Sequence, residues 1–211
     1  MSSGSNKSAG LWMAASFSAT LAATLIVLAF VGSDEKGAIA ALRLSARISF
    51  LLFWIAYAGG ATAKLFGPAF AFLGRRGREF GLAFASAQLV HVGAIAWLFH
   101  VSADPPRFTD GIILAESIGI LWIYAIAALS TERLSLALGA RGRRLFFSAG
   151  LNYVAILFFI NFVVLPIRAG SLHASQILSY LPFALLSIAG PLLWWAAFLQ
   201  SSRRGGRAAS I

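Results

Sequence analysis

The chain has 211 residues, of which 59% are hydrophobic and only 11% are charged. A soluble globular domain carries about 25% charged residues, so this composition excludes an ordinary soluble fold, and the abundance of apolar residues excludes intrinsic disorder. The formal net charge of +10 is typical of nucleic-acid-binding proteins, but a mean hydropathy of +0.82 indicates a chain embedded in lipid, and we expect no nucleic-acid partner. The absence of cysteine excludes disulfides, thiolate metal sites and a cysteine nucleophile.

Six apolar segments are each long enough to cross the hydrocarbon of a bilayer, which takes about 20 residues of helix. Lipid leaves only helices or closed barrels as spanning structures, and continuous apolar runs of this length exclude strands. The pattern therefore predicts an all-α polytopic integral membrane bundle of six transmembrane helices. In chain order, the predicted spans are residues 11–32, 38–66, 80–101, 111–130, 145–167 and 177–200. They form one domain over residues 11–200, between an N-terminal tail of residues 1–10 and a basic C-terminal tail of residues 201–211.

The distribution of charge predicts the orientation of these spans. Six spans place both termini on the same side as the second and fourth loops, and 12 of the 17 Lys and Arg residues lie on that side. By the positive-inside rule, both termini are cytoplasmic. The basic loops at residues 74–78 and 141–144 need no function beyond this signal, with anionic membrane lipids as their partners. The first apolar run is longer than the core of a signal peptide, so we expect an uncleaved first span.

His91 lies about halfway along the third span, where an ionisable residue is a functional candidate by default. Its helical stripe consists mostly of small or polar residues: Ala83, Ala87, Gln88, Ala94 and Ile95. Small residues allow either a close helix neighbour, with His91 hydrogen-bonded to it, or a flat cofactor over an iron-ligating imidazole. His100 is near the outer boundary and about 180° further round the helix, so it cannot share a ligand face with His91. His100 is either an ordinary interfacial histidine or part of an outer site with His173.

Arg43 and Arg47 lie one turn apart at the outer end of the second span, and Glu116 in the fourth span is at the depth of Arg47. One interpretation is a structural ion pair, because an unpaired charge at this depth is costly. The alternative is that the two guanidinium groups bind an anionic group, such as a cofactor carboxylate or a quinone-like head. Asn152 and Asn161 in the fifth span are predicted to form interhelical hydrogen bonds.

Three short segments carry a family resemblance. They are Arg75-Arg76 with residues 79–84 and His91, residues 107–111 with 128–131, and residues 138–139 with 143–145. In these segments the chain resembles the ferric reductase-like transmembrane domain family, and especially the haem-binding membrane subunits of the bacterial methionine sulfoxide reductase system. The resemblance covers roughly residues 40–165. It implies a bacterial cytoplasmic (inner) membrane protein that binds haem b, with His91 as the first ligand to the haem iron.

The chain departs from this family where the family places its fifth-helix haem histidines. Those positions fall at Phe146 and Phe159, and Gly142 replaces a family tryptophan. A phenyl ring has no lone pair for iron, so the bis-histidine haem of the family cannot form in the same way. Either haem is held by His91 alone or together with His100, or the chain keeps the scaffold without the electron-transfer chemistry.

Two functions remain open on this evidence. The first is a ferric reductase-like haem-b subunit that moves electrons across the membrane, from a cytoplasmic or quinone donor to an outer acceptor or redox partner protein. The second is a divergent, haem-free protein of the same fold that acts as a partner or as a quinone- or lipid-binding subunit. No catalytic residue is predicted, and the sequence does not decide whether the chain is an enzyme. Small-solute transport has little support, because no two spans are broken at corresponding positions.

Overall fold

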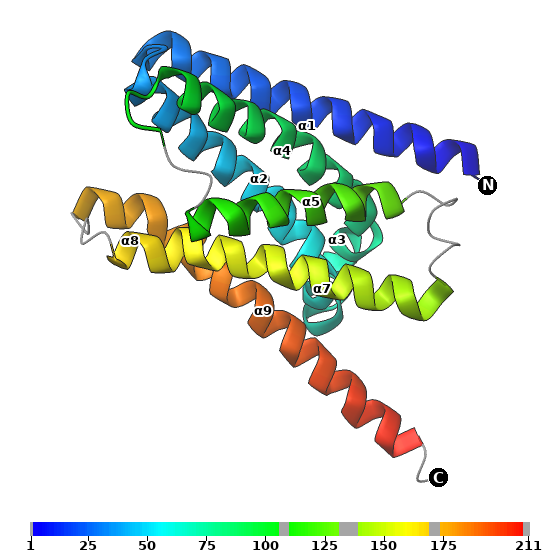
Figure 1. The fold of residues 1–211 in the computed structure, drawn as a ribbon. Helices are drawn as coiled ribbons and strands as arrows, with labels where there is room; N and C mark the ends of the chain where they lie inside the picture. The colour runs from blue at the N-terminus through cyan, green and yellow to red at the C-terminus, as the bar shows by residue number, and fades with distance from the viewer. Residues whose placement is uncertain (1, 106–109, 131–138, 169–173, 209–211) are drawn as a thin grey trace. The chain divides into compact units, whose positions relative to one another are not determined.

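The computed structural model describes residues 2–105, 110–130, 139–168 and 174–208, and every regular element in this part of the chain is a helix (Figure 1). Six helices are long and apolar enough to cross a membrane: Lys7–Val31, Glu35–Phe66, Gly77–Val101, Gly111–Leu129, Gly139–Arg168 and Ser179–Ser201. The predicted all-α fold and its six candidate spans are therefore confirmed. The largest difference is at the fifth span, which begins at Gly139 and not at residue 145.

The chain divides into two compact units. Unit 1 comprises Met1–Phe53 and Arg78–Leu157, and unit 2 comprises Trp54–Gly77 and Phe158–Ile211. Helix α1 (Ser2–Val31) already includes part of the predicted N-terminal tail, and α9 (Ala174–Ala208) continues into the predicted C-terminal tail. Both tails therefore contain helical residues that extend the neighbouring spans.

A tight turn joins α1 to α2 (Glu35–Phe66) in unit 1. Gly32 adopts a φ of 116°, which an L side chain rarely tolerates, and Asp34 then caps the new helix. The Asp34 Oδ1 accepts a hydrogen bond from the Gly37 amide at 3.0 Å, which satisfies one of the free donors at a helix start. A Cβ on Gly37 would collide with the Gly32 carbonyl, so this turn requires glycine at both positions.

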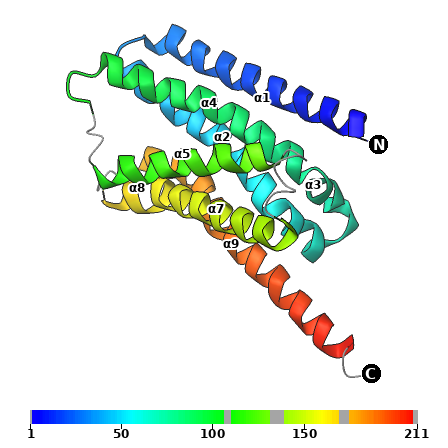
Figure 2. The ribbon, with the colours of Figure 1, turned by 45° about the vertical axis from the view of Figure 1, so that its right-hand side comes forward.

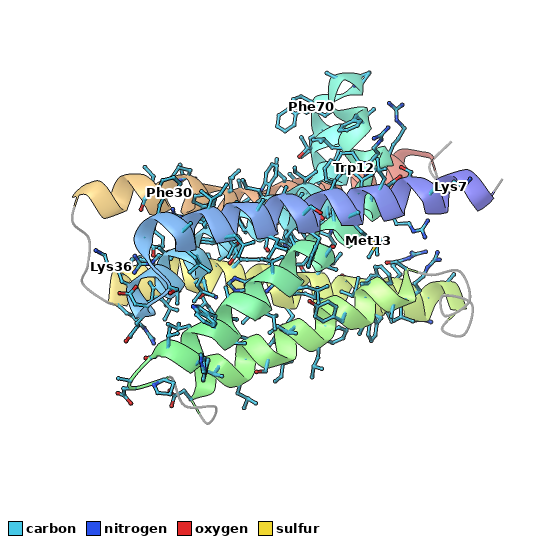
Figure 3. All side chains as sticks on the ribbon, turned by 90° about the horizontal axis from the view of Figure 1, so that it is seen from above. Lys7, Trp12, Met13, Phe30, Lys36 and Phe70 are labelled. Carbon is cyan, nitrogen blue, oxygen red and sulfur yellow. The ribbon has the colours of Figure 1, made fainter. Side chains whose placement is uncertain are left out.

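The helices α1, α2 and α4 (Gly77–Val101) lie side by side in unit 1 (Figures 1 and 2). In lipid, helices associate through close packing and interhelical hydrogen bonds more than through burial of apolar surface. Accordingly, their shared interior consists largely of small side chains: Thr20, Thr24, Ala38, Ala41, Ser45, Ser49, Ala83, Ala87 and Ala94. Ser16 Oγ donates to the Ala83 carbonyl at 2.9 Å and Ser86 Oγ to the Met13 carbonyl at 2.8 Å, so α1 and α4 are joined directly. Met13 and Trp12 lie toward the Lys7 end of α1, and Phe30 toward the other end (Figure 3).

Helices α5 (Gly111–Leu129) and α7 (Gly139–Phe159) pack against each other through glycines. A Cβ on Gly150 would lie 2.6 Å from Trp122 Cε3 and 2.7 Å from Ile126 Cδ1, so the indole occupies the space of a missing side chain. Tyr153 Oη donates to the Ala115 carbonyl at 2.9 Å. Close backbone approach with one hydrogen bond is the packing expected between helices in lipid.

The prediction of a basic loop at residues 141–144 is wrong. Arg141, Arg143 and Arg144 lie in the first turns of α7. Arginine and alanine are good helix formers, and the single Gly142 does not interrupt the helix. The other predicted basic loop is also mostly helical. Arg75 ends α3 (Ala71–Arg75) and Gly77 begins α4, which leaves a short turn at Arg76.

In unit 2, the chain reverses direction after α2 through a 3₁₀ turn, η1 (Pro68–Phe70), and α3 then packs back on α2. Figure 3 labels Phe70 in this reversal. A Cβ on Gly59 would lie 3.0 Å from the Cβ of Leu73, so glycine allows α2 and α3 to pack closely.

Proline shapes the remaining helices of unit 2. The π-helix η2 (Ile160–Val164) precedes Pro166 in α8 (Leu165–Arg168). In a regular α-helix a proline ring clashes with the carbonyl four residues earlier. The wider turn of the π-helix relieves this clash. In α9, Pro182 and Pro191 lie inside the helix. Near Pro191, the indole of Trp54 donates to the Leu186 carbonyl at 2.8 Å, so a side chain from α2 supplies a hydrogen bond to the backbone of this helix.

Candidate functional site

The His91 side chain is held by α2. Its Nδ1 lies 3.0 Å from Ser45 Oγ, and the imidazole also has a backbone hydrogen bond to Leu42. Ser45 Oγ donates to the Leu42 carbonyl at 3.0 Å. That carbonyl can only accept, whereas the serine hydroxyl is able to donate to Nδ1 or accept from it, so the Ser45–His91 bond forms with either tautomer of the imidazole.

The stripe around His91 serves helix packing. Ala83 and Ala87 are fully buried, and Gln88 and Ala94 nearly so, which agrees with the predicted stripe. The Ser16 hydroxyl of α1 reaches the Ala83 carbonyl within this stripe. Of the two interpretations of His91, the structure contains the hydrogen bond to a neighbouring helix.

The residues present do not fit a bis-histidine haem. At the first family position, the Phe146 ring packs on Trp122 with ring centroids 4.6 Å apart, and at the second, Phe159 is 37% exposed. His100 is exposed and packs on the Trp97 ring at 5.5 Å. It lies nine residues from His91, about 13 Å along the helix, so the two cannot ligate one iron from opposite sides. Across the described segments, no group of three or more His, Cys, Asp or Glu residues could hold a metal ion. His173, the proposed partner of His100, lies outside the described residues, as do residues 107–109 and 131–138.

The predicted arginine pair lies away from His91. Arg43 is exposed and Arg47 is half-buried. Each lies two residues from Ser45, which places both on the face of α2 opposite the buried serine. Arg47 and Glu116 each have an interaction partner. Asn152 donates to the Ser148 carbonyl within α7 at 2.8 Å.

Sequence reasoning missed a groove of about 350 Å³ between α1, α2 and α4. Its floor is formed by buried side chains, namely Thr24, Ala38, Ala41, Val90 and Ala94. Its rim is formed by exposed ones, including Leu21, Leu25, Leu89, Gly93 and Trp97. These exposed residues lie on the sides of candidate spans, so the groove opens along the flank of the helices.

Thr24, in the wall of this groove, has a hydroxyl oxygen that is buried beneath the surface of the groove. Thr24 is 5% exposed, and its Oγ1 has no hydrogen bond to any described residue. Thr20, one turn earlier on the same face, donates to the Ser16 carbonyl at 2.7 Å. The sequence signal that could have revealed this stripe is the four-residue spacing of Ser16, Thr20 and Thr24 in the first span. That spacing places three hydroxyls on one helix face.

No family model, curated protein or solved structure matches this chain.

Proposed function

We propose that this chain is a haem-free, multi-pass protein of the bacterial cytoplasmic membrane that binds a lipid-like molecule, a lipid or a quinone, in the groove of unit 1. Both termini are cytoplasmic in this proposal. It is supported by six helices apolar enough to span a membrane and by the excess of basic residues on one side of those spans.

The groove is the observation that carries the proposal. Ligand sites in proteins are concave, mostly apolar, contain a few placed polar groups and have volumes of about 300–1,000 Å³. This groove has about 350 Å³, a mostly apolar lining and a rim of exposed leucines. A molecule dissolved in the bilayer can enter it sideways without crossing water. The chain is then a binding subunit, and no described residue is assigned a catalytic role.

The side chains at the two positions where the ferric reductase-like family has its fifth-helix haem histidines favour a protein without haem. Phe146 and Phe159 offer no nitrogen for a bond to iron. Electron transfer through a bis-histidine haem would require a second imidazole opposite His91. No described histidine lies there, because His100 is a further two and a half turns along α4.

Photolabelling tests the groove. The probe is methyl palmitate with a diazirine in its chain, added to the full-length protein in dodecyl maltoside micelles. We expect saturable labelling of peptides that contain Leu25 or Leu89. Gly93→Leu fills the rim in a place where a Cβ meets nothing within 4 Å, and we expect it to reduce labelling at least tenfold. Gly81→Leu, also in α4 and also in open space, is the matched control and is expected to label like the wild type. Equal, non-saturable labelling of all lipid-facing helices would refute the proposal.

Absorbance spectroscopy tests the absence of haem. The protein is purified from membranes of haem-supplied cells, and spectra are recorded before and after dithionite reduction. We expect no Soret band. A stoichiometric band that disappears in His91→Ala would instead establish the haem-b electron-transfer function.

A further inference from the structure

We infer that the groove binds one acyl chain of a phospholipid from the outer leaflet, and that the zwitterionic head group of this lipid lies at the turn between α1 and α2, residues 32–36. The inference depends on the proposed function and names the ligand of the same site, a lipid and not a quinone. It rests on the lining, the length and the outer end of the groove.

The side chains that line the groove offer no hydrogen bond to a ligand. All of them are hydrocarbon or glycine except Thr24 and Trp97. The Oγ1 of Thr24 is buried beneath the surface of the groove, and the Nε1 of Trp97 donates to the Ser33 carbonyl at 3.1 Å. A quinone ring placed here would bury its carbonyl groups without a donor, which is unfavourable, whereas a hydrocarbon chain needs no donor. The lining therefore favours an acyl chain.

The groove is about as long as one leaflet is deep. On α1 its lining extends from Phe17 to Leu28, eleven residues later, which is about 16 Å along the helix. On α4 it extends from Leu89 to Trp97, about 12 Å. The hydrocarbon of a bilayer is about 30 Å thick, so one leaflet contributes about 15 Å. The volume of about 350 Å³ is at the low end for ligand sites and suits a single chain.

One end of the groove lies at the membrane boundary that the proposed orientation places outside. Leu28 lies three residues before α1 ends at Val31, and Ala38 lies three residues after α2 begins. Trp97 lies at the same end, because its indole reaches the Ser33 carbonyl in the turn, and tryptophan is enriched at membrane interfaces. A phospholipid whose chain fills the groove from this end therefore has its head group at the turn.

The turn carries charges that match a zwitterionic head group. Asp34, Glu35 and Lys36 are all exposed. Lys36 is opposite in charge to a phosphate, and the two carboxylates are opposite in charge to an ammonium group. Two acidic residues and one basic residue give the turn a net charge of −1, which repels a head group with a net negative charge. Figure 3 labels Lys36 and Phe30 toward this end of the helices.

Depth-resolved photolabelling of the wild type tests the inference. Two phosphatidylcholine probes carry a diazirine in one acyl chain, either beside the ester or at the far end, and are added to the full-length protein in dodecyl maltoside micelles. We expect the first probe to label residues near Leu28 and Trp97, and the second to label residues near Phe17 and Leu89. Identical or reversed distributions of label would overturn the inference.

Competition against the methyl palmitate photolabel tests the head group. Dioleoylphosphatidylcholine and dioleoylphosphatidylglycerol have the same chains with a zwitterionic and an anionic head, and decylubiquinone has a chain on a ring with carbonyl groups. We expect phosphatidylcholine to displace the label at a concentration about fivefold lower than phosphatidylglycerol, as for one unit of charge at a membrane surface. Equal displacement by the two phospholipids, or displacement by decylubiquinone at a lower concentration than phosphatidylcholine, would overturn the inference.

A charge variant tests the position of the head group. Glu35→Gln makes the turn neutral, and we expect it to remove most of the preference for phosphatidylcholine. Glu79→Gln is the matched control, because it removes the same charge at the start of α4, at the opposite end of this helix from Trp97, and it should keep the preference. Equal effects of the two variants would overturn the placement of the head group at the turn.

The outcomes separate the two proposals. Saturable labelling that is lost in Gly93→Leu but has the wrong depth pattern would overturn the inference and leave the groove as a binding site. Unchanged labelling in Gly93→Leu would overturn both.

Discussion

The hydrogen bond between Ser45 and His91 should stabilise unit 1, and Ser45→Ala measures its contribution. Ser45 is fully buried, and its oxygen lies 3.0 Å from both His91 Nδ1 and the Leu42 carbonyl. Interhelical hydrogen bonds in membrane proteins contribute on average about 0.6 kcal/mol and at most about 1.7 kcal/mol. These energies correspond to a change of about three- to eighteenfold in the unfolding equilibrium constant. The retained backbone bond to Leu42 places the expected effect toward the lower value.

Ser49 provides the matched control for this substitution. It lies one turn further along α2 and is equally buried, but its Oγ has no partner among the residues that the structure describes. Ser49→Ala removes a costly unpaired hydroxyl, so we expect unchanged or increased stability. Both variants remove one hydroxyl oxygen from the same face of α2. The difference between their free energies of unfolding therefore measures the effect of having a hydrogen-bond partner.

The assay is equilibrium unfolding in dodecyl maltoside micelles with increasing SDS, followed by the fluorescence of the six tryptophans. A double-mutant cycle of Ser45→Ala with His91→Leu gives the coupling energy between the two side chains. We expect a stabilising coupling of about 0.6 kcal/mol or more. Substitutions at independent sites add within about 0.3–0.5 kcal/mol. A coupling energy within that margin of zero, or equal destabilisation by Ser45→Ala and Ser49→Ala, would refute a stabilising hydrogen bond between Ser45 and His91.

Two further predictions concern packing and orientation. Gly150→Ala should destabilise the pair α5 and α7 by about 1–3 kcal/mol, because its Cβ overlaps the Trp122 ring. Gly81→Ala, which meets nothing within 4 Å, should be neutral or stabilising in the same unfolding assay, and equal effects of the two would contradict the packing argument. The proposed orientation can be tested on single cysteines without background, because the chain has none. In intact spheroplasts, a membrane-impermeant maleimide should label Ala103→Cys, whereas Ala69→Cys should react only after permeabilisation. The reverse pattern would place the termini outside.

The spans were predictable because each depends only on a continuous apolar run, which the sequence shows directly. The ends of the helices were less predictable. The charges of Arg141 and Arg144 predict a loop at this position. In the structure α7 begins at Gly139, because arginine and alanine favour a helix and no proline interrupts it. Charge indicates where a chain leaves the hydrocarbon, but a helix can continue past that point into water.

The sequence predicts the type of residue around His91, but it does not predict which residue forms a hydrogen bond with the imidazole. Helical periodicity placed small residues on its stripe, and the structure buries them. The partner, Ser45, is 46 residues away in the sequence, and no local pattern identifies which residue of another helix meets the imidazole. The groove was missed for a related reason, since it is a property of three helices together and its polar group, Thr24, is not ionisable.

Unpaired hydroxyls mark a ligand site only where space lies beside them. Ser49 and Thr24 both lack a partner in the described part of the chain, and each follows a hydroxyl residue that has one. Ser49 is fully buried and is not part of the groove wall, so no molecule can reach it without displacing the helices. Thr24 lines the groove, but its Oγ1 is as inaccessible as the Oγ of Ser49. The unpaired hydroxyl is therefore a cost of packing in both α2 and α1. For this reason, substitution of either residue by alanine should change stability and should leave labelling of the groove unchanged.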